Sequence, residues 1–128
     1  MTRIAVATFE LDKWDPQAQE EAGGTEFARV AIAKTFTGSV EGSSTVEMLT
    51  ATNATSRAYV AFERLSVSVD GRKGTFVLRH TAGDEGLSLV VLGGSGSGEL
   101  TGLSGTAAIT QDEAGHHTFT LSYELRTA

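Results

Sequence analysis

Two long alternating runs that flank a short turn sequence constrain this fold more than any other stretch of the chain. In the first run, residues 59–69, one face is largely apolar and the other ends in polar side chains, so we expect the apolar face to point inward. The return run, residues 75–81, carries Phe76 and His80 on its inward face. Between them, DGRK at residues 70–73 is typical of a hairpin turn. The pattern predicts a β-hairpin with one buried face.

The expected register of this hairpin brings a carboxylate and an imidazole together. A four-residue loop over residues 70–73 places Glu63 opposite His80, on the face that we expect to be buried. Two interpretations stay open. In one, Glu63 is a structural carboxylate that pairs with an imidazole or a buried Arg and holds the strand register. In the other, both side chains line a cavity, where burial raises the pKa of Glu63 and its neighbour tunes it for proton transfer.

The rest of the chain predicts more strands, and no segment of useful length has a helical period. Alternating runs predict strands at residues 3–11, 27–37, 45–52, 87–92, 106–111 and 116–125. The last run has the clearest pattern, with an inward face of His117, Phe119, Leu121, Tyr123 and Leu125. With the hairpin, the chain is all-β with about eight strands.

Residues 12–26 interrupt this alternation. We expect either a short helix that begins after Asp15-Pro16 and ends at Gly23-Gly24, or an acidic loop with one helical turn. A loop of this length in a small barrel either covers an opening or simply connects two strands.

An internal similarity favours a closed sheet. The segment TGSVEGSST at residues 37–45 aligns without a gap with SGELTGLSG at residues 97–105, sixty positions later, and the same shift places Tyr123 on Glu63. Both segments are typical of Gly-rich corners in which one apolar side chain tucks under a sharp bend. Two matching halves of alternating strands predict an eight-stranded antiparallel β-barrel that has no exposed edges. We expect one domain over residues 1–128.

Composition narrows the class of protein. The formal net charge is −6 and no basic stripe is present, so nucleic acid and anionic membrane surfaces are poor partners. The chain has no Cys, which removes disulfides and thiolate catalysis. The N-terminal stretch lacks the apolar core of a signal peptide, and no apolar run approaches the ~20 residues that span a bilayer. We expect a soluble cytoplasmic protein.

Two motif classes give no support for a cofactor or a metal. The Gly-rich run GGSGSGELTGLSG is followed neither by Gly-Lys-Ser/Thr nor by a predicted helix, so it is a poor phosphate loop. His116 and His117 are adjacent on a strand and point to opposite faces, so they cannot both ligate one ion. We expect hydrogen-bonded or solvated imidazoles, no metal site and no cofactor.

The candidate site therefore centres on the expected interior of the barrel. Glu63 and His80 would move or hold a proton. Tyr123, which the repeat places at the level of Glu63, would add a phenol hydroxyl as a hydrogen-bond donor. Lys34 lies on an otherwise apolar face, and Glu47 competes with its neighbours Val46 and Met48 for the interior. The expected ligand-binding set is Tyr59, Phe76, Phe119, Glu47 and Lys34.

Several segments together resemble a known family. They are FELDKWD, KTFTGSVEGSSTVEML, AYVAFERLSVSVDGRKGTFVLRH, GSGSGELTGLSGT and HTFTLSYEL. The chain is similar to small bacterial domains of unknown function grouped with the allene oxide cyclase-like barrels. The resemblance implies an eight-stranded barrel, akin to plant allene oxide cyclases and dirigent proteins, that is usually oligomeric and needs no cofactor. Relatives of that barrel bind apolar, reactive small molecules and steer their cyclisation, isomerisation or coupling.

Three functions stay open from the sequence. The first is a cofactor-independent isomerase or cyclase that acts on an apolar substrate inside the barrel. The second is a calycin-like carrier that holds a hydrophobic molecule unchanged, and the third is a barrel filled by its own side chains. Ala58, Val60 and Phe62 fall on the outer face of their strand, which predicts a homo-oligomer, either a dimer or a trimer.

Overall fold

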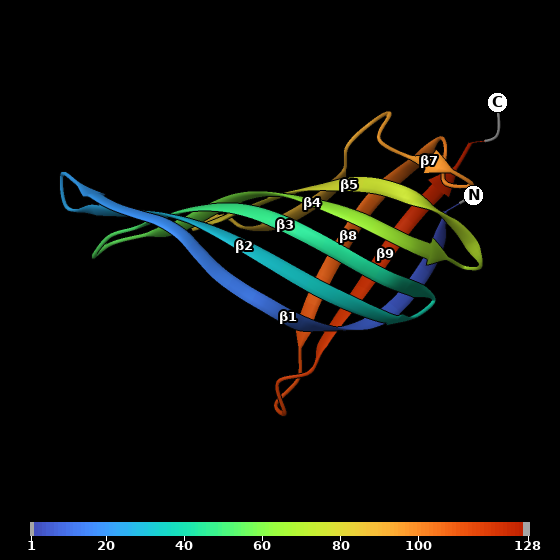
Figure 1. Cartoon of the computed structure of the whole chain (residues 1–128), viewed down its shortest axis with the longest axis horizontal. Helices are drawn as coiled ribbons and strands as arrows, with labels where there is room; N and C mark the ends of the chain where they lie inside the picture. The colour runs from blue at the N-terminus through green and yellow to red at the C-terminus, as the bar shows by residue number, and fades with distance from the viewer. Residues whose placement is uncertain (1, 127–128) are drawn as a thin grey trace.

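The structure, a computed structural model that describes residues 2–126, consists of strands and turns, with no helix among those residues (Figure 1). The strands are β1 (Arg3–Ala22), β2 (Thr25–Gly38), β3 (Val40–Thr52), β4 (Arg57–Val69), β5 (Arg72–Gly83), β6 (Gly86–Val91), β7 (Ser97–Gly98), β8 (Leu103–Gln111) and β9 (His117–Leu125). Each paired ladder is antiparallel.

The sheet closes on itself. The order β4-β3-β2-β1-β9-β8-β6-β5 is completed by pairing between β4 and β5, while the short β7 adds to β5 alone. The eight longer strands therefore form a closed antiparallel barrel, as the sequence predicts. Closure removes the free edges that an open sheet of alternating strands would leave.

Residues 12–26 form neither the short helix nor the loop that the sequence predicts. Instead, β1 runs on to Ala22, and Gly23 and Gly24, both at positive φ, turn the chain directly into β2. The ladder between β1 and β2 has register shifts at Leu11/Lys13 and at Pro16/Ala18. A β-bulge inserts an extra residue and tolerates a proline, so it interrupts the alternation without ending the strand. The long β1–β2 hairpin projects from one end of the barrel (Figure 1).

The hairpin of β4 and β5 has the predicted faces but a different register. Its turn is the two-residue Asp70-Gly71, both at positive φ, which is the geometry that an Asp-Gly hairpin turn favours. Glu63 therefore lies opposite Leu78, and His80 is its diagonal neighbour. A shift of two residues along one strand keeps each side chain on its face, so the inward set is unchanged.

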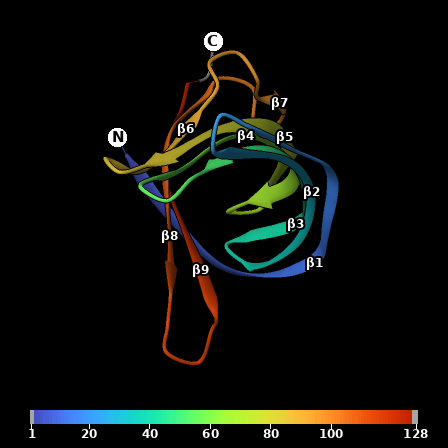
Figure 2. The same ribbon diagram turned by 90° about the vertical axis from the view of Figure 1, so that its left-hand side faces the viewer.

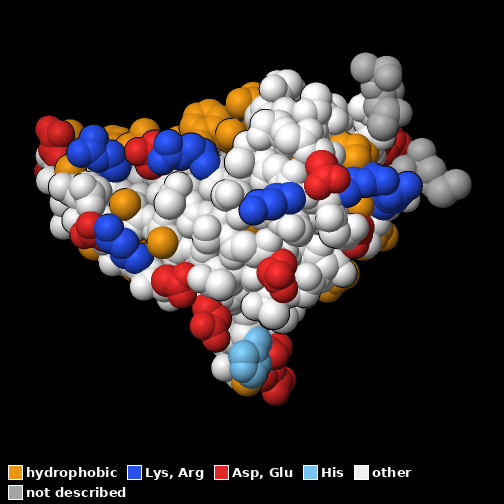
Figure 3. Space-filling model, turned by 45° about the vertical axis from the view of Figure 1, so that its right-hand side comes forward, with side chains coloured by type: hydrophobic (Ala, Val, Ile, Leu, Met, Phe, Trp, Pro, Cys, Tyr) orange, Lys and Arg blue, Asp and Glu red, His pale blue; other side chains and the backbone are white. Residues whose placement is uncertain are grey.

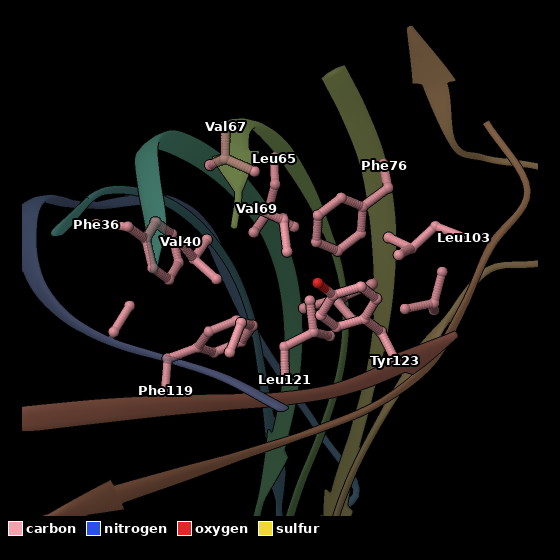
Figure 4. Close-up of a cluster of buried hydrophobic side chains, with 14 of the residues drawn as sticks. Phe36, Val40, Leu65, Val67, Val69, Phe76, Leu103, Phe119, Leu121 and Tyr123 are labelled. Atoms are coloured by element: carbon pink, nitrogen blue, oxygen red, sulfur yellow. The ribbon is translucent and has the colours of Figure 1, made fainter. Parts of the chain in front are cut away.

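Large apolar side chains pack together at one end of the barrel (Figure 4). Inward-facing positions of all eight longer strands supply this packed core, and its largest fully buried aromatic side chains are Phe36, Phe76, Phe119 and Tyr123. On β1, Ala5, Ala7 and Phe9 point into this core, which settles a facing that the sequence left open. Interiors packed in this way leave no room for a ligand at that end.

The two Gly-rich corners adjoin the packed end. Val40 and Leu100, the apolar residues of the two repeat segments, are fully buried, as the corner pattern predicts. Gly42 and Gly102 both have positive φ, and a Cβ at either would come within 2.3 Å of a backbone carbonyl oxygen of a neighbouring strand or of the C-terminal segment. These positions require glycine because the backbones meet there.

Candidate functional site

The opposite end of the barrel, seen in Figure 2, is open and holds a cavity of about 550 Å³. This size is within the range of small-molecule sites. A second apolar cluster consists of Val30, Ile32, Val46, Met48 and Ala61, and all of these except Val30 line the cavity wall. The side chains with polar or charged atoms in the lining are Trp14, Lys34, Thr50, Thr52, Arg57, Tyr59, His80 and His117.

A hydrogen-bonded polar cluster lies between this cavity and the packed core. Glu63 on β4 is fully buried and accepts three contacts. Its Oε2 accepts a hydrogen bond from Ser44 Oγ at 2.6 Å, and its Oε1 lies 2.8 Å from His80 Nε2 and 3.3 Å from Lys34 Nζ. Lys34 and His80 line the cavity floor, whereas Glu63 does not. The cluster thus joins β2, β3, β4 and β5.

Two opposing effects set the pKa of Glu63. Burial, the larger single effect, raises it, because a carboxylate loses its hydration inside the barrel. The hydrogen bond from His80, the charge of Lys34 and the hydrogen bond from Ser44 lower it, and together they prevail. The pKa of Glu63 is therefore below its ordinary value, and the group is a carboxylate at neutral pH. Of the two interpretations from the sequence, the one that places Glu63 in a cavity expects a raised pKa, because it includes burial but not the contacts with Lys34 and Ser44.

The carboxylate of Glu63 determines the orientation and the tautomer of His80. An ionised carboxylate only accepts hydrogen bonds, so Nε2 of His80 carries the proton at this contact. In a neutral imidazole, Nδ1 is then the acceptor. The ring is 3% exposed and lines the cavity, and Nδ1 has no hydrogen-bond partner among residues 2–126. His80 thus offers a proton acceptor to whatever occupies the cavity floor.

Lys34 is the second buried group that faces the cavity. Its side chain is 6% exposed, with Nζ 4.5 Å from the centre of the Phe9 ring. An ammonium group has three N–H donors, and within the described part of the chain Glu63 Oε1 is the one acceptor in contact with it. Donors on the remaining sides of Nζ are available to an oxygen atom in the cavity.

The structure brings some of the predicted site residues together. Glu63, His80 and Lys34 meet in the polar cluster, and the half-buried Tyr59 lies in the cavity wall. Burial and the nearby charge of Glu63 raise the pKa of Tyr59 above its ordinary value, so it is a neutral phenol.

Other predicted site residues lie elsewhere. Glu47 is on the outer face of β3, because Val46 and Met48 take the inward positions. Phe76 and Phe119 belong to the packed core and not to the cavity wall. Tyr123 also lies in that core, where its hydroxyl donates a hydrogen bond to Asp70 in the β4–β5 turn.

The internal repeat places Tyr123 wrongly beside Glu63, because an alignment of strand patterns does not fix the position of a residue along the barrel axis. Along β4, Glu63 is roughly 20 Å from Asp70 at the usual rise of a strand, and Tyr123 reaches Asp70. Burial, followed by the hydrogen bond to Asp70, raises the pKa of the Tyr123 phenol. Tyr123 therefore serves the packed end of the barrel.

A family described as "Protein of unknown function (DUF3224)" matches residues 5–123 of the chain. This chain belongs to the DUF3224 family. A crystal structure of a DUF3224 protein of unknown function from Shewanella oneidensis MR-1 is 36% identical, with a TM-score of 0.92, over 99% of this chain and 100% of that one. No curated protein matches the chain. The family description names no activity, so the chemistry of this DUF3224 chain has to come from its own side chains.

Sequence reasoning missed several residues of the polar cluster and of the cavity in this DUF3224 chain. Ser44 supplies the shortest contact to Glu63, yet it resembles the other serines of its segment. Trp14 falls in the segment that the sequence predicts as a short helix or a loop, but it lies on β1 and lines the cavity. His117 stacks on Phe9, with ring centres 4.9 Å apart, and its inward facing was predicted without a role at the cavity.

Two further features of this DUF3224 chain concern metals and membranes. Among residues 2–126, no three side chains of the types His, Cys, Asp or Glu gather in a way that could hold a metal ion. The same residues contain no helix that is long and apolar enough to cross a membrane.

Proposed function

We propose that this protein binds an apolar small molecule in its open cavity and isomerises or cyclises it by proton transfer, without a cofactor. The observation that carries this proposal is the His80 imidazole at the cavity floor, oriented by a buried carboxylate and free at Nδ1. A carboxylate that holds an imidazole in one tautomer is a common arrangement for a general base. The apolar wall supplies affinity and selects the shape of the substrate.

Three residues have distinct roles in this proposal. Nδ1 of His80 removes a proton from the bound molecule and returns it to another atom of the same molecule, so the reaction is an isomerisation or a ring closure. Glu63 does not touch the cavity; it is a positioning residue that stabilises the imidazolium formed after the first step. Tyr59 and the apolar wall hold the molecule in a reactive conformation.

The resemblance to allene oxide cyclase-like barrels belongs to the same proposal. Relatives of that barrel bind apolar, reactive molecules and steer them by shape, which agrees with a cavity whose wall is largely aliphatic. The second candidate function, a carrier that releases its ligand unchanged, is favoured by the same apolar wall. The two candidates differ in the role of His80: the enzyme needs its imidazole to convert the bound molecule, whereas the carrier does not.

Ligand binding in the cavity can be tested with two matched variants, each of which replaces an alanine by phenylalanine. Ala61 is buried in the cavity wall, and Ala108 is exposed on β8, so a phenylalanine fills the cavity at the first position but not at the second. We expect Ala61→Phe to abolish the binding of Nile red, a neutral apolar dye, and Ala108→Phe to leave it unchanged. Equal binding by both variants would show that the dye, and the ligand it represents, lies elsewhere.

Turnover separates the enzyme from the carrier. The protein is incubated with an organic extract of cells, and mass spectrometry identifies which compounds are retained and which are converted. For the enzyme, wild type converts a retained compound into an isomer of equal mass, and His80→Gln retains the compound without converting it. Retention without any conversion by wild type favours the carrier, and retention of nothing contradicts both functions.

A further inference from the structure

We infer that the substrate is an apolar carbonyl compound whose oxygen binds Lys34 Nζ while His80 removes a proton from the adjacent carbon. This assignment is based on two buried side chains of the cavity floor, Lys34 and His80, each of which has hydrogen-bonding atoms without a partner in the described part of the chain. Lys34 presents N–H donors and His80 presents an acceptor, and Glu63 Oε1 holds both, at 3.3 Å and 2.8 Å. The assignment rests on the proposed function, because it needs His80 to act as the base.

The chemistry of a base at His80 narrows the substrate class. Imidazole has an ordinary pKa of about 6.5, which is far too low to remove a proton from an unactivated hydrocarbon. A carbonyl group acidifies the adjacent C–H bond by accepting the electron pair as an enolate. The developing negative charge then falls on oxygen, and a donor placed at that oxygen stabilises the transition state.

Lys34 is suited to that role and no acidic side chain opposes it. The ionisable side chains in the cavity lining are Lys34, Arg57, Tyr59, His80 and His117. Glu63 neutralises one positive charge from behind the floor but is fully buried, so it presents no negative surface to the ligand. A negative oxygen in the cavity thus meets cationic or neutral donors, although the chain as a whole carries a net charge of −6.

The step balances within the substrate and two side chains. The C–H bond next to the carbonyl breaks, its proton forms a bond to Nδ1 of His80, and its electron pair moves to the carbonyl oxygen beside Lys34. The imidazolium then returns the proton to a different carbon of a conjugated enolate. In a ring closure, the enolate carbon instead bonds to a second carbon of the same molecule, a bond between that carbon and its oxygen breaks, and this oxygen takes the proton, so that the product is again an isomer. No oxidant, reductant or metal is consumed.

A phenol tests the oxyanion site without knowledge of the substrate, because a phenolate resembles an enolate. The probes are para-nitrophenol, whose absorbance reports its ionisation, and para-nitroanisole, which has a similar shape and cannot ionise. We expect binding to wild type to lower the pKa of para-nitrophenol by about one unit or more, as a nearby cation does. Lys34→Met should remove most of that shift and leave the affinity for para-nitroanisole within about twofold. Lys13→Met, at an exposed lysine, is the matched control.

The outcomes separate this inference from the proposed function. If both probes bind and the pKa of para-nitrophenol stays at its value in water, Lys34 is no oxyanion site, while an apolar cavity that binds ligands remains. The same holds if Lys34→Met keeps the full shift. If neither probe binds, the cavity takes no such ligand and the proposed function fails with it. If Lys34→Met does not fold, Arg57→Met, at the other permanently charged side chain of the lining, replaces it: a shift that survives this change supports Lys34, and a shift that is lost overturns the assignment.

A second inference comes from the outer face of the sheet, independently of the cavity. We propose that a second copy of this chain docks on an apolar patch formed by Leu49, Val60 and Phe62, which are 55%, 52% and 53% exposed. They lie side by side on β3 and β4, because Leu49 pairs with Val60 and Phe62 is the next outward residue of β4. Apolar side chains that gather in this way are typical of protein interfaces. Figure 3 shows how such side chains gather along one edge of a face of the molecule, next to Lys and Arg side chains.

Charge complementarity selects the second copy as the occupant. Glu47, Phe62 and Arg79 form one row across β3, β4 and β5, with a negative charge at one end and a positive charge at the other. Neither charged side chain forms an ion pair within residues 2–126. A two-fold axis in the interface and parallel to β4 places Glu47 of each copy against Arg79 of its partner, and Phe62 against Phe62.

A charge exchange tests this dimer. We expect light scattering at micromolar concentration to give a dimeric mass for wild type and a monomeric mass for Glu47→Arg and for Arg79→Glu, because each places like charges together. The double variant, Glu47→Arg with Arg79→Glu, restores opposite charges and should restore the dimer. A monomeric wild type, a trimer, or single variants that stay dimeric would overturn the proposal. Both residues are exposed, so circular dichroism should show that all variants remain folded.

Discussion

Replacement of Glu63 by glutamine should destabilise the protein through Lys34 more than through the lost carboxylate itself. Glutamine keeps the shape of the side chain and one acceptor oxygen, but it leaves the 6%-exposed Lys34 ammonium without its counter-charge. Removal of one partner from a buried ion pair typically costs about 3–5 kcal/mol. Lys34 borders a cavity that water can enter, so we expect the low end, about 3 kcal/mol.

A double-mutant cycle in urea measures this effect. Unfolding curves at neutral pH for wild type, Glu63→Gln, Lys34→Met and the double variant give four free energies of unfolding. If the unpaired ammonium is the cause, the double variant should be more stable than the two single losses predict, by about 2 kcal/mol or more. The control is Glu41→Gln, at an exposed glutamate on β3, which should change stability by about 0.5 kcal/mol or less.

Two results would refute this reasoning. The first is a Glu63→Gln variant within about 0.5 kcal/mol of wild type, which would mean that the buried charges do not depend on one another. The second is strict additivity in the cycle, which would mean that Lys34 and Glu63 contribute to stability separately although their atoms lie 3.3 Å apart.

Further predictions concern acid stability and a corner glycine. The pKa of Glu63 is lowered in the folded state. The ionised group therefore stabilises the fold fully above the ordinary glutamate pKa of about 4.3, and this contribution is lost as the pH falls through the lower pKa of the folded state. Urea unfolding at a series of pH values should therefore show the advantage of wild type over Glu63→Gln shrinking below about pH 4; a constant advantage would contradict the assigned pKa direction. Gly42→Ala, where a Cβ would come within 2.3 Å of a carbonyl oxygen at positive φ, should cost clearly more than the ~1 kcal/mol of an ordinary Gly→Ala change. Gly93→Ala, with open space around it, is the matched control, and equal melting of the two variants would argue against a crowded corner.

The sequence predicts the faces of strands better than their lengths. Alternation identified the inward sets of β4, β5 and β9, because side chains on one face repeat every second residue. The same signal failed on β1, where bulges near Lys13 and Pro16 shift the alternation by one residue each. The predicted four-residue turn of the β4–β5 hairpin is two residues longer than the observed turn, because Asp-Gly strongly favours a two-residue turn.

Contacts across the barrel were beyond pattern reasoning. Lys34 on β2 stood out as a charge on an apolar face, but its partner lies on β4, with β3 between them. Which inward residues meet depends on the stagger between all the strands, and the sequence of any one hairpin does not contain that information. For the same reason, Tyr123 was placed beside Glu63 although it reaches Asp70 at the packed end.

The position of the polar cluster connects the two halves of the barrel. On one side, the packed core holds Glu63 in a fixed place; on the other, His80 and Lys34 reach the cavity from the same carboxylate oxygen. A carboxylate and an ammonium are a poor choice for stability alone, since well-packed apolar residues in place of a buried ion pair are often as stable or more so. The proposed function gives such charged groups a reason, because their donors and their acceptor border a cavity. Under that proposal, the packed half of the barrel provides the fixed geometry that a proton-transfer site requires.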